Sequence, residues 1–139
     1  MGFDEDLKFG HKYEKKSLKY LDFDDYEFKK GYFKEYDLLI KKNNKITKIE
    51  IKCDRLSYKT GNLAIEYRCN DKDSGLSSTK ADYWMYFIIK PNDETCYKIP
   101  VDDLRKLVKN CRSVRGGDGY NSELYLLKVK ECEKYIVKL

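Results

Sequence analysis

Apolar residues follow a helical spacing at the start of the chain. Residues 4–21 place apolar or aromatic side chains about one helical turn apart, with lysines and acids between them. The acids Asp4, Glu5 and Asp6 stand where they complement the dipole of a helix in its first turn. This segment is therefore expected to form an N-terminal helix, although Gly10 lowers its helix propensity.

The next part of the chain has the patterns of β-strands. Residues 62–69 alternate between apolar and polar positions, which predicts a half-buried strand. Residues 45–53 also alternate, and Asn43-Asn44 just before them predicts a hairpin turn to the short apolar run 36–40. Residues 26–33 are rich in aromatic side chains and are interrupted at Gly31. A meander of two or three strands is expected here.

A long, dense apolar run dominates the following segment. Residues 83–90 predict a buried strand, and residues 96–99 are its expected hairpin partner. Residues 70–78 before it are expected to form a loop, after which Ser78 or Thr79 can cap a short turn.

The last third of the chain predicts one more helix and a final pair of strands. Residues 101–111 have apolar side chains at helical spacing after an acidic first turn. Residues 116–119 form a glycine-rich loop, and residues 124–129 with 135–137 resemble a closing strand pair. The simplest packing is a single domain over residues 1–139, with a mixed central β-sheet flanked by helices in an α/β (α+β) fold.

Composition excludes several classes of protein. With 41% hydrophobic and 38% charged residues, the chain can build a packed core. No apolar run has the length of a membrane span, and the acidic start lacks the features of a secretory signal. The five cysteines have no metal-site spacing, so a zinc site is not expected. A cytoplasmic protein with reduced thiols and no membrane partner is expected.

Basic residues concentrate in two stretches, although the formal net charge of +5 is modest. Residues 41–59 hold seven Lys or Arg against two acids, and residues 105–115 hold five with no acid. Such stretches suit a phosphate-rich partner, because neutralising phosphates releases counterions. They equally suit solvated loops, so charge alone leaves both interpretations open.

One short segment carries the residue types that phosphodiester hydrolysis needs. Side chains alternate along a strand, so Glu50 and Lys52 point to the same face, with the Ile51 carbonyl between them. The hairpin at residues 43–44 can bring Asp37 beside Glu50. Two carboxylates and an ammonium group can then hold a hard cation and an attacking water. Without Asp37, the other two would be an ordinary solvent-facing pair.

The arrangement of these residues resembles that of a known nuclease superfamily. Asp37 is followed by Glu50-Ile51-Lys52 and is preceded by the helical segment Gly10-His11-Lys12-Tyr13-Glu14, as in PD-(D/E)xK nucleases. That superfamily includes restriction enzymes, phage nucleases and archaeal Holliday-junction resolvases. Residues 75–84 also resemble a segment of small phage- and virus-encoded members. Tyr36 stands where the superfamily name has proline.

The resemblance implies a restriction-endonuclease-like core of αβββαβ order and an endonuclease that cleaves DNA, including branched or junction DNA. It implies that Asp37, Glu50 and Glu14 bind Mg²⁺ or Mn²⁺, with the Ile51 carbonyl as a further ligand, and that Lys52 positions or activates the water. Glu14 equally fits a surface position on its helix. The alternatives are a nucleic-acid-binding module without catalysis and a structural protein in which the acids are incidental.

Several other residues have both a functional and a structural interpretation. Glu66 is either a site residue or part of the outer face of its strand, and Thr79 is either a site residue or a turn cap. Lys80 and Asp82 either contact substrate or form local contacts. The basic residues expected to contact DNA are Lys41, Lys42, Arg55, Lys59, Lys80, Arg112 and Arg115. Because a duplex or junction has two strands to cut, a homodimer is also expected.

Overall fold

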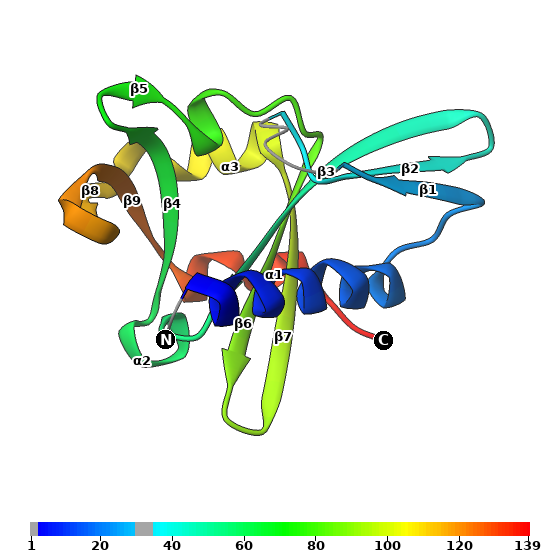
Figure 1. The fold of residues 1–139 in the computed structure, drawn as a ribbon, viewed down its shortest axis with the longest axis horizontal. Helices are drawn as coiled ribbons and strands as arrows, with labels where there is room; N and C mark the ends of the chain where they lie inside the picture. Colours follow the sequence, from blue (N-terminus) through cyan, green and yellow to red (C-terminus); the bar gives the residue numbers. More distant parts are fainter. Residues whose placement is uncertain (1–2, 30–34) are drawn as a thin grey trace.

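The N-terminal helix packs along one face of a β-sheet in the computed structural model, which describes residues 3–29 and 35–139 (Figure 1). Helix α1 (Phe3–Ser17) continues into the short 3₁₀ helix η1 (Leu18–Tyr20), which confirms the predicted N-terminal helix. The buried ring of Tyr13 lies 5.2 Å from the ring of Phe87 in the sheet, centroid to centroid. Within the described ranges, every helix is too short or too polar to cross a bilayer.

Six strands form the sheet that α1 covers, in the order β1-β2-β3-β6-β7-β10. They are β1 (Asp25–Phe28), β2 (Leu38–Lys42), β3 (Lys45–Asp54), β6 (Tyr83–Lys90), β7 (Asp93–Pro100) and β10 (Ile136–Val137). Strands β3 and β6 run parallel, and the other neighbouring pairs run antiparallel. The sheet is therefore mixed, as predicted. Strand β1 confirms part of the strand expected at 26–33, of which residues 30–33 lie outside the described residues.

A two-residue turn at Asn43-Asn44 fixes the register of β2 on β3. Both residues have positive φ, 50° and 65°, which tight hairpin turns require and asparagine tolerates. Leu38 consequently pairs with Ile49. Asp37 comes directly before β2, and its backbone N–H donates to the Ile49 carbonyl at 3.0 Å. The turn thus places Asp37 next to Glu50.

Alternation along β3 separates the two faces of the sheet. Ile49 and Ile51 are buried on the face that α1 covers, in a core that includes Tyr13. Glu50 and Lys52 point to the opposite face. The predicted orientation of the β3 side chains is therefore confirmed.

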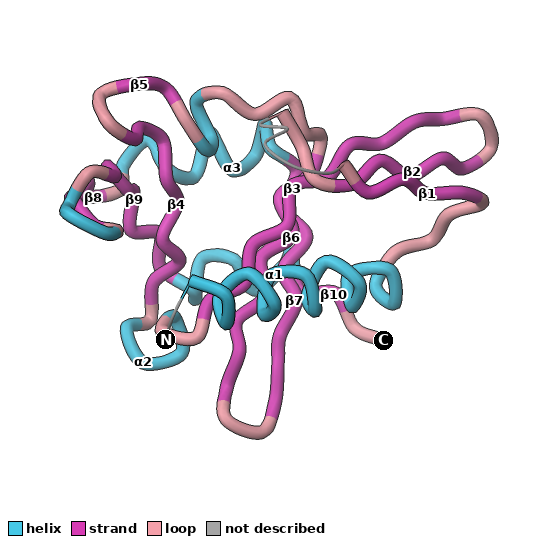
Figure 2. Tube along the Cα trace, in the orientation of Figure 1, coloured by secondary structure: helices cyan, strands magenta, loops and turns pink. Residues whose placement is uncertain are grey.

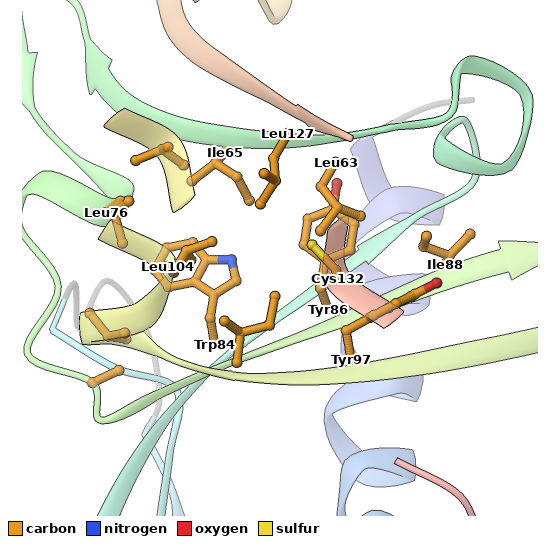
Figure 3. Packing of buried hydrophobic residues seen from close by; sticks show 14 of the residues in the cluster. Leu63, Ile65, Leu76, Trp84, Tyr86, Ile88, Tyr97, Leu104, Leu127 and Cys132 are labelled. Atoms are coloured by element: carbon orange, nitrogen blue, oxygen red, sulfur yellow. The ribbon is translucent and has the colours of Figure 1, made fainter. Parts of the chain in front are cut away.

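A second sheet, which the sequence patterns did not predict, covers that opposite face. Its strand order is β5-β4-β9-β8, with all neighbours antiparallel. The strands are β4 (Asn62–Cys69), β5 (Lys72–Asp73), β8 (Arg112–Gly116) and β9 (Ser122–Lys128). Leu63 and Leu127 of this sheet belong to one core with Trp84 and Tyr86 of the six-stranded sheet (Figure 3). The main core therefore lies between the two sheets.

Short helices connect the strands of the two sheets. They are α2 (Ser57–Thr60), η2 (Gly75–Ser77), α3 (Val101–Leu107), η3 (Val108–Asn110), η4 (Asp118–Tyr120) and η5 (Val129–Tyr135). Leu104 of α3 is fully buried between the sheets (Figure 3). Together, α3 and η3 confirm the helix predicted at 101–111.

The closing strand pair predicted from residues 124–129 and 135–137 is wrong. Strand β9 pairs with β4 and β8, whereas β10 pairs with β7, and η5 separates them. Residues 112–116, for which no strand was predicted, form β8. The physical reason is that strands take partners that bury their apolar faces, and those partners lie far away in the sequence.

The arrangement as a whole is the fold class expected from the sequence. Helix α1 precedes β1, β2 and β3, and the mixed sheet they begin is consistent with a restriction-endonuclease-like α+β fold. The β2–β3 hairpin, with β1 alongside it, projects as an arm from the body (Figure 2).

Candidate active site

The edge of β3 brings Asp37 and Glu50 together. The pairing of β2 with β3 ends at Leu38 and Ile49, so the following residues of β3 continue past the end of β2. There the carboxylate of Asp37 takes the place of a strand, because its Oδ2 accepts the backbone N–H of Ile51 at 2.8 Å. The hydrogen bond holds the Asp37 side chain against the backbone next to Glu50.

Lys52 joins these two acids from the same strand. Its Nζ lies 3.3 Å from Oε2 of Glu50 and 5.7 Å from the centre of the Trp84 ring. The Glu50 side chain is 13% exposed and that of Lys52 is 42% exposed. The carboxylate is therefore recessed, while the Lys52 side chain beside it is partly exposed.

The neighbours of Glu50 change its acidity. Burial is the main reason that its pKa rises to about 7. The positive charge of Lys52 opposes this rise, whereas the nearby carboxylate of Asp37 adds to it. Glu50 therefore lies close enough to the carboxylate of Asp37 for that charge to raise its pKa further.

The other two groups respond to the same charges. Burial lowers the pKa of Lys52, but the charges of Glu50 and Asp37 outweigh burial, and the net shift is upward. Burial raises the pKa of Glu14, and the charge of Asp37 raises it further, whereas His11 lowers it. Glu14 of α1 therefore lies close enough to feel Asp37 electrostatically.

A pocket of about 500 Å³ opens in front of Glu50 and Lys52. Its opposite wall comes from the second sheet, with Glu66 on β4 and the segment 69–75 beyond it. Glu66 accepts a hydrogen bond from Oγ of Ser122 at 2.7 Å. The structure therefore brings Glu66 to the same pocket as Glu50 and Lys52.

Part of this wall was missed by sequence reasoning, which treated residues 70–78 as a loop. Asn70 and Asp71 both have positive φ, 52° and 62°, and form a tight turn into β5 like the one at Asn43-Asn44. The Asn-Asp pair between two polar strand ends was a sequence signal that could have predicted this turn.

Gly75, with φ of +50°, lies so near β4 that an added Cβ would be 2.2 Å from the Glu66 carbonyl oxygen. Only glycine allows this approach.

The acids do not form a closed metal cage. Across residues 3–29 and 35–139, no group of three or more His, Cys, Asp or Glu side chains is arranged to hold a metal ion. The crowded oxygen donors are Asp37 and Glu50, with Glu14 nearby. Such donors suit a hard cation that keeps several of its own water ligands.

Three of the other candidate residues make local contacts. Thr79 is buried, and its Oγ1 donates to the Glu35 carbonyl and accepts the N–H of Ala81. Oδ2 of Asp82 accepts the backbone N–H of Lys48 at 2.8 Å. The backbone N–H of Lys80 donates to the same Glu35 carbonyl as Thr79, and its side chain is exposed. The contacts of Thr79 and Lys80 with Glu35 anchor the chain just before Asp37, and the contact of Asp82 holds β3 at Lys48.

The basic residues expected to contact DNA lie in separate places. Lys41 and Lys42 are on the β2–β3 hairpin, where Lys42 pairs with Asp22. Arg55 and Lys59 lie beyond the other end of β3, where the Arg55 guanidinium stacks 4.3 Å over the ring of Phe9. The remaining two, Arg112 and Arg115, are exposed on β8 of the second sheet. The structure does not gather them into one patch.

Comparison with known proteins identifies the family. A model of the PD-(D/E)XK endonuclease family matches residues 30–118, well over half of the chain. The chain belongs to the PD-(D/E)XK endonuclease family. This match confirms the resemblance drawn from the sequence and identifies a nuclease; it includes Asp37, Glu50 and Lys52 but not Glu14. Neither the curated proteins nor the solved structures contain a significant match.

Proposed function

We propose that this PD-(D/E)XK endonuclease is a divalent-metal-dependent enzyme that hydrolyses phosphodiester bonds in DNA, including branched or junction DNA. One observation carries the proposal: Asp37 and Glu50 meet beside Lys52 at the edge of β3, held by the contacts at Ile51 and Glu50. Membership of an endonuclease family supports the same chemistry.

In this proposal, Asp37 and Glu50 hold a Mg²⁺ or Mn²⁺ ion. Both ions prefer oxygen ligands, and a cation between the two carboxylates would offset the burial of Glu50 and its repulsion with Asp37, which together raise the pKa of Glu50. Glu14 and the Ile51 carbonyl are further candidate ligands. When bound, the ion would supply charge stabilisation at the phosphate and a lowered water pKa.

Lys52 is the residue proposed to hold the attacking water. An ammonium group has three N–H donors, of which one is directed to Glu50 and others remain for a water oxygen. Its position over Trp84 restricts the side chain, which favours a fixed geometry for attack. Its positive charge, which the neighbouring acids maintain, also stabilises the negative charge that develops on the phosphate.

The remaining contacts with DNA are also proposals. The pocket between the sheets would take the strand that is cut, with Glu66 on its far wall. The basic residues of the hairpin, of the α2 region and of β8 would hold the backbone at several points. A homodimer would present two such sites to the two strands, and light scattering of the protein with and without DNA tests this.

The decisive experiment is cleavage of supercoiled and branched DNA with Mg²⁺ or Mn²⁺. The proposal expects cleavage by the wild-type protein and its loss in Lys52→Ala and Asp37→Ala, while salt-dependent DNA binding persists in both variants. Binding without cleavage with either ion would refute the proposal and favour a non-catalytic nucleic-acid-binding protein. Unchanged cleavage by either variant would show that these residues are not the active site.

A further inference from the structure

A second pocket lies on the other face of the β2–β3 hairpin. It has a volume of about 420 Å³, and three lysines reach it: Lys42 and Lys45 from the hairpin and Lys98 from β7. The other lining residues are Asp22, Ile40, Asn43, Thr47 and Tyr83. The pocket extends from the turn of the hairpin, at Asn43, to Tyr83 and Lys98 of the sheet.

This pocket is separate from the candidate active site. Lys98 pairs with Met85, whose side chain is buried on the α1 side of the sheet. Lys45 and Thr47 share the α1 side with Ile49, because side chains alternate along β3. Glu50 points to the opposite face, so this pocket is distinct from the candidate active site.

The charges in the pocket favour an anion. Three ammonium groups meet one carboxylate, that of Asp22, which is paired with Lys42. Among the residues that the structure describes, neither Lys45 nor Lys98 has an ion-pair partner. The pocket therefore carries positive charge that the described chain does not neutralise.

Of the three amines, Lys98 is the one whose surroundings most favour contact with an anion. Its Nζ lies 4.3 Å from the centre of the Tyr83 ring, and its side chain is half-buried. Burial lowers the pKa of this amine, which means that its charged form lacks full solvation. A bound anion would restore the interactions that the ammonium group loses on burial.

We propose that this pocket binds a backbone phosphate of the nucleic acid, away from the bond that is cut. The assignment rests on the proposed nuclease function for the identity of the ligand. Lys42 and Lys45 flank the turn at the end of the β1-β2-β3 arm, where they can reach the phosphate backbone of a bound nucleic acid. The arm would thus contact the backbone on the face that the active site does not use.

The test compares DNA binding by the wild-type protein and by Lys98→Met, measured by fluorescence anisotropy in EDTA over a series of salt concentrations. The loss of one phosphate contact should reduce the slope of log affinity against log salt by about 0.9, and weaken binding roughly eightfold near 0.1 M salt. Lys90→Met is the matched control, because Lys90 is an exposed lysine on the same β6–β7 hairpin, at its far end. It should keep the wild-type slope.

Lys45→Met provides an independent variant, because Lys45 is exposed next to the turn and its substitution should not affect folding. Like Lys98→Met, it should reduce the slope of log affinity against log salt. The proposal would be overturned if both pocket variants kept the wild-type slope, or if Lys90→Met reduced the slope as much as they do. Competition by polyglutamate but not by inorganic phosphate would also overturn it.

Two further outcomes separate this proposal from others. If Lys98→Met loses affinity for a mononucleotide but binds a DNA duplex normally, the pocket serves a free nucleotide and the backbone assignment is wrong. If the slopes change as expected but no metal supports cleavage, the proposed nuclease function fails while the phosphate pocket stands. If cleavage is normal and the slopes do not change, only the proposal that this pocket binds phosphate is refuted.

Discussion

Glu50 and Glu94 are two largely buried carboxylates on the same sheet, and their pKa values shift in opposite directions. The Glu50 side chain is 13% exposed and that of Glu94 is 20% exposed. Burial tends to raise the pKa of both groups. The pKa of Glu50 nevertheless rises to about 7, whereas that of Glu94 falls below its ordinary value.

The neighbours of the two carboxylates explain the difference. Glu94 accepts hydrogen bonds from Lys16 at 2.7 Å and from the hydroxyls of Tyr13 and Tyr20, both at 3.2 Å. Because these donors come from α1 and η1, the Glu94 cluster fastens the N-terminal helix to β7. Glu50 has one amine beside it and a second acid, Asp37. The Glu94 carboxylate is satisfied by three donors of the protein itself, whereas Glu50 has one amine and a neighbouring acid, which is why we propose that a cation binds beside it.

The largest expected effect comes from removing one of the crowded acids. Asp37→Asn keeps the shape of the side chain and an oxygen for the N–H of Ile51, but it removes the charge that would hold a cation. Cleavage should fall by roughly a thousandfold, equivalent to about 4 kcal/mol. Thermal unfolding should show equal or higher stability, because the repulsion with Glu50 is gone. A stable, fully active Asp37→Asn protein would contradict the functional role given to the acids beside Glu50.

The pH dependence of stability should reveal Glu50 in the metal-free protein. Its folded pKa of about 7 lies above the ordinary value of 4.5, so the folded state binds its proton more tightly than the unfolded state. The resulting contribution is present below pH 4.5 and is lost as the pH rises through 7, and it amounts to about 3 kcal/mol. Urea unfolding of the wild type and Glu50→Gln at several pH values measures it. Mg²⁺ should restore the lost stability above pH 7, and identical pH profiles would refute the assignment.

Glu94 should show the opposite sign. Its folded pKa is lowered, so its contribution is present above the ordinary value of 4.5 and is lost as the pH falls through the folded pKa. Glu94→Gln should lower the free energy of unfolding by about 1–2 kcal/mol at neutral pH, because hydrogen bonds to a charged group are lost. Cleavage at 25 °C should stay close to that of the wild type. A strong loss of activity without loss of stability would mean that the Glu94 cluster is functional.

The smallest effect is expected at Glu14, which feels the charge of Asp37 from the neighbouring helix. Glu14→Gln should weaken the response to Mg²⁺ by about tenfold, the size of effect typical of groups that support a metal site from outside its main ligands. A Mg²⁺ titration of cleavage measures the shift. Glu133→Gln, which changes an exposed acid in η5, is the control and should leave the midpoint unchanged.

The core of the candidate site was predictable because it is local. One tight turn, marked in the sequence by Asn43-Asn44, carries Asp37 back to Glu50, and strand alternation then orients Lys52. These relations span fewer than twenty residues and depend on rules that any strand pair obeys. The helix that carries Glu14 was also predicted, from its apolar residues and its acidic first turn, although Gly10 weakens the pattern.

The far wall of the pocket was decided only by the tertiary structure. Glu66 faces Glu50 because β4 pairs with β9 and both pack over Trp84, a contact between segments that no local pattern relates. The same holds for β9 and β10, which were expected to pair with each other, and for Lys98 beside the hairpin lysines. Alternation specifies which side of a strand is buried, but not which distant strand will bury it. That choice depends on how whole apolar faces fit together, so the sequence alone determined the hairpin that brings Asp37 to Glu50, and the folded chain determined what surrounds it.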